Sequence, residues 1–168
     1  MKKSLLKNNI LSFSALAFFL GAFNIQAQNL WTGGSGDNLF MTTSNWTTAP
    51  LFDGTDNLKI GTTVNPVILN NSAAATPAIT VTQFQTSPGT ELTTVSDITS
   101  TSTSLNVFIG GKLHITGGTF WGKGNIYFGN SVGETPYCNI ETGATLKIKA
   151  AILVGRSVPA TIDVNGGT

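Results

Sequence analysis

The chain has 168 residues, enough for one ordinary domain, and 10% of them are charged. Nine basic residues stand against eight acidic ones, and no basic run is interleaved with aromatic residues, which argues against nucleic-acid binding. A single cysteine, Cys138, excludes an internal disulfide, and a single histidine, His114, excludes a histidine-rich metal site.

The first 27 residues have the pattern of a secretory signal peptide. Three lysines among the first seven residues precede an apolar stretch (residues 10–23), and Ala27 offers a small residue before a predicted cleavage at Gln28. The apolar stretch covers roughly 14 residues, fewer than the ~20 that a transmembrane helix needs. We therefore expect residues 1–27 to be removed on export and no membrane span to remain. The exported chain then carries six basic and eight acidic residues.

Two tryptophans, Trp31 and Trp46, bracket a glycine-rich turn at the start of the exported chain (residues 32–36). Glycine permits the positive φ angles that such a turn needs. The two rings have two interpretations, a platform for a sugar or a hydrophobic cover over one end of a domain. We favour the cover, because large aromatic side chains usually serve burial.

A second turn contains Asp53, Asp56 and Asn57, and it leads into a strand in which Leu58 and Ile60 alternate with polar neighbours. The three polar residues partly match a calcium-binding loop. The full ligand pattern and its closing glutamate are absent, so we assign no metal ligand and expect no cofactor, with calcium as a poorly supported alternative.

Residues 28–65, which we call the leader, contain four short motifs in succession: Trp31–Gly34, Asn45–Trp46, Pro50 and Gly54–Ile60. Their order resembles the leader of secreted bacterial β-helix proteins, namely autotransporter-like passengers and surface adhesins with autotransporter-associated strand repeats. The chain departs from that pattern where Thr55 separates the usual Gly-Asp pair. The resemblance implies a right-handed parallel β-helix, secreted or on the outer surface of a Gram-negative-type bacterium.

Short strands separated by turn residues are predicted in the middle of the chain, at Val67–Leu69, Ile79–Thr82 and Leu92–Val95. The Ser/Thr-rich segment 96–104 is either a linker between two domains or a turn and strand within one solenoid. We favour the solenoid, because apolar positions return directly after it. No stretch of the exported chain has the 3.6-residue period of a helix.

The last third of the chain repeats a short apolar strand that ends in glycine: Val107–Gly110, Ile126–Gly129 and Ile152–Gly155. The repeat length of roughly 20–26 residues fits one β-coil better than a propeller blade of about 40 residues. At each corner glycine, a side chain would need a positive φ or would crowd the next coil. The sequence therefore predicts an all-β, right-handed parallel β-helix (solenoid) preceded by a signal peptide. We expect a leader or cap over residues 28–65 and coils over residues 66–168, which are predicted to continue in a longer parent protein.

No catalytic residue is assigned from the sequence. His114 alternates with apolar neighbours and is predicted to face outward, without a nucleophile-elbow motif elsewhere in the chain. Glu141 and Asp163 are expected at matching places in successive coils, about 4.8 Å apart. They are either the carboxylate pair of a glycoside hydrolase or, as we favour, two solvated residues of the outer face. Cys138 is predicted to pack as a small buried residue.

The sequence therefore predicts a non-enzymatic, adhesin-like β-helix that binds an extracellular glycan, a surface or a partner through loops such as residues 130–136. The candidate binding residues are Trp31, Trp46, Glu141 and Asp163. The alternative is the N-terminal part of a β-helix polysaccharide lyase or glycoside hydrolase with its catalytic coils downstream.

Overall fold

The computed structural model describes residues 28–61, 65–70, 79–103 and 107–168. These residues form fifteen short strands and one 3₁₀ turn, Thr43–Asn45 (η1), with no α-helix among them. No helix in these ranges is long and apolar enough to cross a membrane. The predicted signal peptide, residues 1–27, lies outside the described residues.

The strands are arranged in three parallel sheets. The first sheet contains, in spatial order, β1 (Asn29–Leu30), β2 (Asn57–Ile60), β5 (Gln83–Thr86), β8 (Val107–Ile109), β11 (Ile126–Phe128) and β14 (Ile152–Val154). The second sheet contains β3 (Val67–Leu69), β6 (Glu91–Thr94), β9 (Lys112–Ile115), β12 (Tyr137–Glu141) and β15 (Thr161–Asn165). The third sheet contains β4 (Ile79–Val81), β7 (Ile98–Ser100), β10 (Thr119–Gly122) and β13 (Thr145–Ile148).

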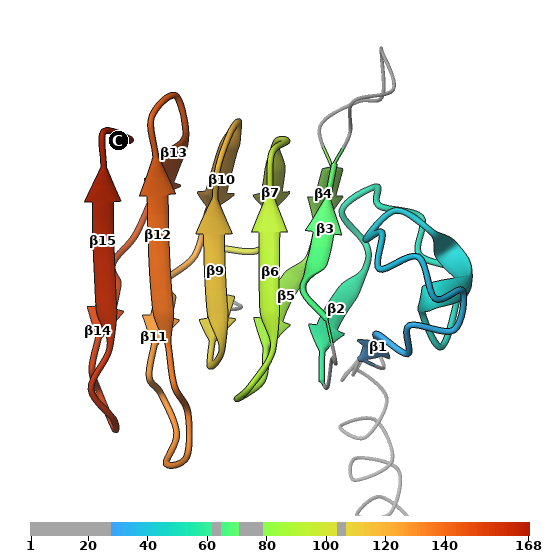
Figure 1. Cartoon of the computed structure of the whole chain (residues 1–168), viewed down its shortest axis with the longest axis horizontal. Helices are drawn as coiled ribbons and strands as arrows, with labels where there is room; N and C mark the ends of the chain where they lie inside the picture. Colours follow the sequence, from blue (N-terminus) through green and yellow to red (C-terminus); the bar gives the residue numbers. More distant parts are fainter. Residues whose placement is uncertain (1–27, 62–64, 71–78, 104–106) are drawn as a thin grey trace, which may run out of the picture.

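The chain winds as a parallel β-solenoid, in which each coil adds one strand to each sheet (Figure 1). Each strand pairs with its equivalent in the coils before and after it, so Ile126 is level with Val107 on one side and Ile152 on the other. The predicted all-β, parallel solenoid is confirmed. The Ser/Thr-rich segment contributes β7 to the third sheet, which confirms that it belongs to the solenoid rather than to a linker.

Alternation along the strands creates one continuous core between the three sheets. In the second sheet, Leu92, Leu113 and Cys138 are level with one another, point inward and are fully buried. Burial of a leucine side chain contributes about 1.5–3 kcal/mol, and no single coil encloses such a side chain without its neighbours. Cys138 packs as predicted, and burial raises the pKa of its thiol to about 12.

The corner glycines have the two roles expected of them. Gly129 adopts a φ of 76°, which L side chains rarely tolerate. A Cβ atom on Gly110 would lie 2.9 Å from the carbonyl oxygen of Thr86 in the preceding coil. Each corner therefore excludes a side chain, either because of its backbone conformation or because a neighbouring coil lies too close.

The leader covers one end of the solenoid (Figure 1). It pairs with the first coil at all three sheets: β1 pairs with β2, Leu39 forms a bridge with Ile68, and Asp53 forms a bridge with Thr80. The leader thus acts as an incomplete coil that satisfies the exposed edges of the first complete one. β2, which lies within the predicted leader of residues 28–65, pairs in parallel with β5 of the next coil.

At the other end of the solenoid, the last described strands have a coil on one side only. Their inward apolar side chains are partly open, with Ile152 43%, Val154 47% and Val164 57% exposed. Their equivalents one coil earlier, Ile126 and Phe128, are fully buried. Burial in this fold therefore depends on a neighbouring layer.

Candidate functional site

The outer surface of the second sheet carries a row of polar side chains on four adjacent strands. We call it the polar face. It comprises the outward residues of β6, β9, β12 and β15: Glu91, Thr93, Lys112, His114, Tyr137, Asn139, Glu141, Asp163 and Asn165. These positions alternate with the buried core residues of the same strands, so the core packing fixes the direction in which each polar side chain points.

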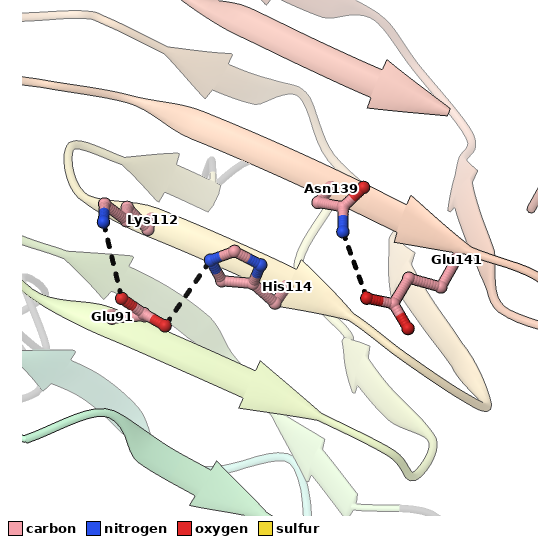
Figure 2. Close-up of polar contacts among 5 residues, drawn as sticks. All are labelled: Glu91, Lys112, His114, Asn139 and Glu141. Atoms are coloured by element: carbon pink, nitrogen blue, oxygen red, sulfur yellow. Dashed lines mark hydrogen bonds and ion pairs between the residues drawn. The ribbon is translucent and has the colours of Figure 1, made fainter. Parts of the chain in front are cut away.

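Glu91 on β6 bridges the two outward residues of β9 (Figure 2). One of its carboxylate oxygens lies 3.7 Å from Lys112 Nζ, and the other lies 3.5 Å from His114 Nε2. Lys112 is directly opposite Glu91 in the register, whereas His114 is one position further along the sheet face. The three side chains remain partly exposed, so the pairs orient one another more than they stabilise the fold.

Tyr137 continues this group onto β12. Its ring centroid lies 5.7 Å from that of His114, and its hydroxyl donates a hydrogen bond of 2.9 Å to Asp163 Oδ2 on β15. That hydrogen bond, followed by desolvation and the negative charge of Asp163, raises the pKa of Tyr137. Tyr137 therefore stays protonated at neutral pH and acts as a hydrogen-bond donor rather than as a base.

Asn139 lies at the centre of the polar face, level with His114 on β9 and with Asp163 on β15. Its Nδ2 donates to Glu141 Oε1 at 3.2 Å, as Figure 2 shows. Its Oδ1 accepts from Asn165 Nδ2 at 2.7 Å. Asn139 is 9% exposed, whereas Glu141 is exposed, so the buried amide holds an accessible carboxylate in place.

The expected match between Glu141 and Asp163 is wrong by two residues. Glu141 is level with Asn165, and Asp163 is level with Asn139. The error arises because β12 begins at Tyr137, so the strand extends further back than the repeat pattern indicated. Both carboxylates do lie on the polar face, but their hydrogen-bond partners are Asn139 and Tyr137 rather than each other.

The two candidate tryptophans lie in the leader, far along the chain from these residues. Trp31 and Trp46 are each 5% exposed, with ring centroids 5.2 Å apart and nearly perpendicular planes. Trp46 Nε1 donates to the carbonyl oxygen of Phe40 at 2.9 Å. This burial agrees with the hydrophobic cover and leaves little ring surface for a sugar.

The acidic turn of the leader uses its carboxylates internally. Asp53 Oδ1 accepts from both the backbone nitrogen and the hydroxyl of Thr55, and these bonds lower the pKa of Asp53. Asp56 Oδ2 accepts from the backbone nitrogen of Phe52 at 2.6 Å. Within the described ranges, no group of three or more acidic, histidine or cysteine side chains is placed to hold a metal ion.

The loop after β11, residues 130–136, is tied to the coil that follows it. Ser157 Oγ donates to the carbonyl oxygen of Asn130 at 2.7 Å, and Arg156 Nη1 donates to Asn130 Oδ1 at 3.3 Å. Glu134 Oε2 accepts from the backbone nitrogen of Ser131, and Val132 at the tip is 90% exposed. The loop has a fixed base and an open tip, and its role in binding stays a prediction.

Sequence reasoning missed six members of the polar face: Glu91, Thr93, Lys112, Tyr137, Asn139 and Asn165. Their signal is a polar residue at equivalent outward positions of successive coils. These equivalent positions can be identified only when the register between strands is known. The sequence does not reveal the register, because the loops between Glu91 and Lys112 and between Lys112 and Tyr137 differ in length.

Chemically, the polar face offers fixed carboxylate, amide, imidazole, ammonium and phenol groups on a flat support. Such a surface forms several hydrogen bonds at once with a ligand rich in hydroxyl groups. Comparison of the chain with models of known protein families, with curated proteins and with solved structures finds no match.

Proposed function

We propose that the protein is an extracellular, adhesin-like β-solenoid that binds a glycan through the polar face. The observation that carries this proposal is the set of polar side chains side by side on four adjacent strands. Contacts join Glu91, His114, Tyr137 and Asp163 in one group. Hydrogen bonds join Glu141, Asn139 and Asn165 in a second group. The fold supplies a flat and stiff surface, because every strand under the row pairs on at least one side with a neighbouring coil.

A glycan suits this surface because sugar hydroxyl groups both donate and accept hydrogen bonds. Successive strands lie about 4.8 Å apart, so the face repeats donors and acceptors at short, regular intervals. Its internal contacts hold the side chains before a ligand arrives, which reduces the entropy lost on binding. The half-buried rings of Tyr137 and His114 add apolar surface beside the polar groups.

The alternative of a polysaccharide-degrading enzyme requires a base or a pair of cooperating carboxylates. The raised pKa of Tyr137 disfavours this residue as a base. The Glu91–His114 pair is the remaining acid–base candidate on the polar face, and the following experiment distinguishes the two functions.

Binding is tested by screening the exported chain on a glycan array and measuring the affinity of the best ligand by calorimetry. We expect the double variant Glu91→Gln, Asn165→Ala to lower the affinity about tenfold, because it removes the carboxylate charge that pairs with Lys112 and His114 and the amide of Asn165. Lys59→Ala on the outer side of β2 serves as the control and should bind normally. Depolymerisation of the ligand by the wild-type chain, abolished by His114→Ala, would favour the enzyme. Absence of any glycan ligand would reject the proposal.

An extracellular location follows from the signal-peptide pattern of residues 1–27 and from the resemblance to secreted β-helix proteins. Expression of the whole chain in a Gram-negative host should yield an exported protein that begins at Gln28, as measured by N-terminal mass spectrometry. Replacing Leu16 and Leu20 by arginine should retain the full-length chain in the cytoplasm, because the apolar stretch is then interrupted. An unprocessed chain that is nevertheless exported would contradict this.

A further inference from the structure

The outer surface of the third sheet carries a cationic group that the polar face does not include. Trp121 on β10 points outward between the buried Phe120 and Gly122, and Lys147 on β13 lies directly opposite it. Lys147 Nζ lies 4.4 Å from the centroid of the Trp121 ring, and Lys123 Nζ lies 5.1 Å from the same centroid. We call Trp121, Lys123, Lys147 and the neighbouring Lys149 the tryptophan–lysine cluster.

The three lysines concentrate positive charge on an otherwise acidic protein. The exported chain has six basic residues, and three of them belong to this cluster. Within the described part of the chain, none of the three lysines forms an ion pair; the two ion pairs present both involve Glu91. Two acidic residues lie near the third sheet. Asp97 Oδ1 accepts from the backbone nitrogen of Thr119, and Asp53, whose Oδ1 accepts from Thr55, forms a bridge with Thr80 of β4.

The indole ring organises these charges. Two ammonium groups within 5.1 Å of one aromatic centroid are held there by cation–π attraction, which is worth about 0.5–1 kcal/mol at exposed sites. The backbone nitrogen of Lys149 donates to the carbonyl oxygen of Gly122, which fixes the third lysine beside the same strand. Long side chains that are already ordered lose less entropy when an anion binds.

The indole nitrogen itself points to an oxygen-bearing ligand. Trp121 Nε1 is shielded from solvent and has no hydrogen-bond acceptor among the residues that the structure describes. An unsatisfied donor of this kind is unfavourable, and an oxygen atom that reached it when the neighbouring side chains move aside would relieve it. The cluster therefore combines positive charge with an unsatisfied hydrogen-bond donor that is covered in the unbound protein.

We infer that the tryptophan–lysine cluster binds an anionic polysaccharide, with carboxylate or sulfate groups paired to Lys123, Lys147 and Lys149. A polymer fits better than a single small anion, because the lysines follow two adjacent strands on a flat sheet. Beyond Trp121, the same row continues with Thr99 and Thr80, whose hydroxyl groups suit sugar hydroxyls.

Single-stranded nucleic acid is the competing polyanion. Its binding sites usually stack successive bases on several aromatic rings, whereas this row has one ring followed by threonines. This arrangement favours the polysaccharide, and the inference does not depend on the polar face.

The inference is tested by measuring binding of the exported chain to polygalacturonate, dextran sulfate and neutral dextran at low and high salt. We expect one or both acidic polymers to bind, with weaker binding at high salt, and neutral dextran not to bind. The double variant Lys123→Gln, Lys147→Gln should lower the affinity at least about tenfold. The double variant Lys59→Gln, Arg156→Gln is the matched control, since it removes the same charge outside both the cluster and the polar face and should leave the affinity within about twofold.

Far-ultraviolet circular dichroism of each variant verifies that the solenoid is intact, and exposed lysines are not expected to affect it. An equal loss of affinity in the two double variants would show that binding depends only on net charge, and it would overturn the assignment of the site to the tryptophan–lysine cluster. Tighter binding of a single-stranded oligonucleotide than of either acidic polysaccharide would overturn the ligand class, and failure of both acidic polymers to bind would overturn the inference as a whole. Loss of binding to neutral glycans upon Glu91→Gln, Asn165→Ala reports on the polar face alone.

Discussion

Asp37 shows how single residues hold the leader together. Its carboxylate accepts hydrogen bonds from the hydroxyls of Thr42 and Ser35, from the backbone nitrogen of Leu39 and from Asn45 Nδ2. These donors favour the charged form, and the bond from Thr42 contributes most to lowering the pKa of Asp37. Asn45 is fully buried, so this small network joins the surface turn to the inside of the cap.

The lowered pKa of Asp37 predicts a pH-dependent contribution to stability. An aspartate has an unfolded-state pKa of about 3.9, and a lower value in the folded state means that the contribution is present above that pH. It is lost as the pH falls through the unfolded value toward the folded one, because the unfolded chain takes up a proton there while the folded chain keeps the charged form. The midpoint of urea unfolding should thus differ between wild type and Asp37→Asn at neutral pH and converge in acid. A difference that is constant with pH would contradict this.

A substitution at Gly111 tests how closely neighbouring coils approach each other, because it adds a single Cβ atom between them. A Cβ at this position would lie 2.3 Å from the carbonyl oxygen of Thr90 and 2.6 Å from that of Ser87, and backbone atoms cannot move aside cheaply. We expect Gly111→Ala to lower the free energy of unfolding by about 1–3 kcal/mol or more. Gly61→Ala is the matched control, because a Cβ there meets nothing within 4 Å. Equal unfolding midpoints for the two variants would disprove the crowding.

At the scale of the strands, much of the fold follows from alternation in the sequence. β2, β4 and β9 each contain apolar residues at every second position, so their existence is predictable from local patterns. The alignment of one coil with the next cannot be predicted from local patterns, because it depends on loops of different length. That is why Glu141 and Asp163 were recognised as outward residues yet placed two positions out of register.

Binding chemistry was harder to predict than the strands for the same reason. Glu91 and His114 are 23 positions apart in the chain, and their side chains meet only because β6 and β9 are adjacent. The lysines around Trp121 likewise come from two coils, so they form no visible basic run in the sequence. Sites in a solenoid are assembled across coils and require the register.

Alkylation of Cys138 measures whether β12 unfolds together with the rest of the solenoid. It is fully buried, β12 pairs with β9 and β15 on its two sides, and the pKa of its thiol is about 12. We expect the native chain to resist alkylation by iodoacetamide in mildly alkaline buffer, because both burial and the scarcity of thiolate oppose the reaction. In increasing urea, labelling should rise together with the loss of circular dichroism. Rapid labelling of the native chain would show that β12 opens independently of the rest.

The whole molecule combines a stiff solenoid with two outer faces of different charge. The polar face contains three carboxylates, whereas the outer side of the third sheet contains three lysines around Trp121. The sheets that carry them share one core, so the two faces have a fixed relative orientation on a rigid body. A protein of this kind can hold two chemically different ligands without a conformational change.

The cap should govern the stability of the whole molecule through Phe40. Its ring is fully buried, and its centroid lies 5.1 Å from that of Trp46 in the leader and 6.1 Å from that of Phe84 in the solenoid. Phe40→Ala removes the side chain that joins the two, and we expect it to lower the free energy of unfolding by about 3–5 kcal/mol. Leu51→Ala, in the same leader but 73% exposed, should change it by less than about 0.5 kcal/mol.

The unfolding of Phe40→Ala also reveals how the cap and the coils are coupled. In a Trp121→Phe background, tryptophan fluorescence reports only from Trp31 and Trp46 in the cap. If the leader is an integral first layer, one cooperative transition should then shift as a whole in both this fluorescence and circular dichroism, which reports from the coils. A variant whose fluorescence changes at low urea while its circular dichroism unfolds at the wild-type midpoint would show instead that the coils are stable without their cover. The cap would then close the edge of the first coil without contributing to the stability of the remaining coils.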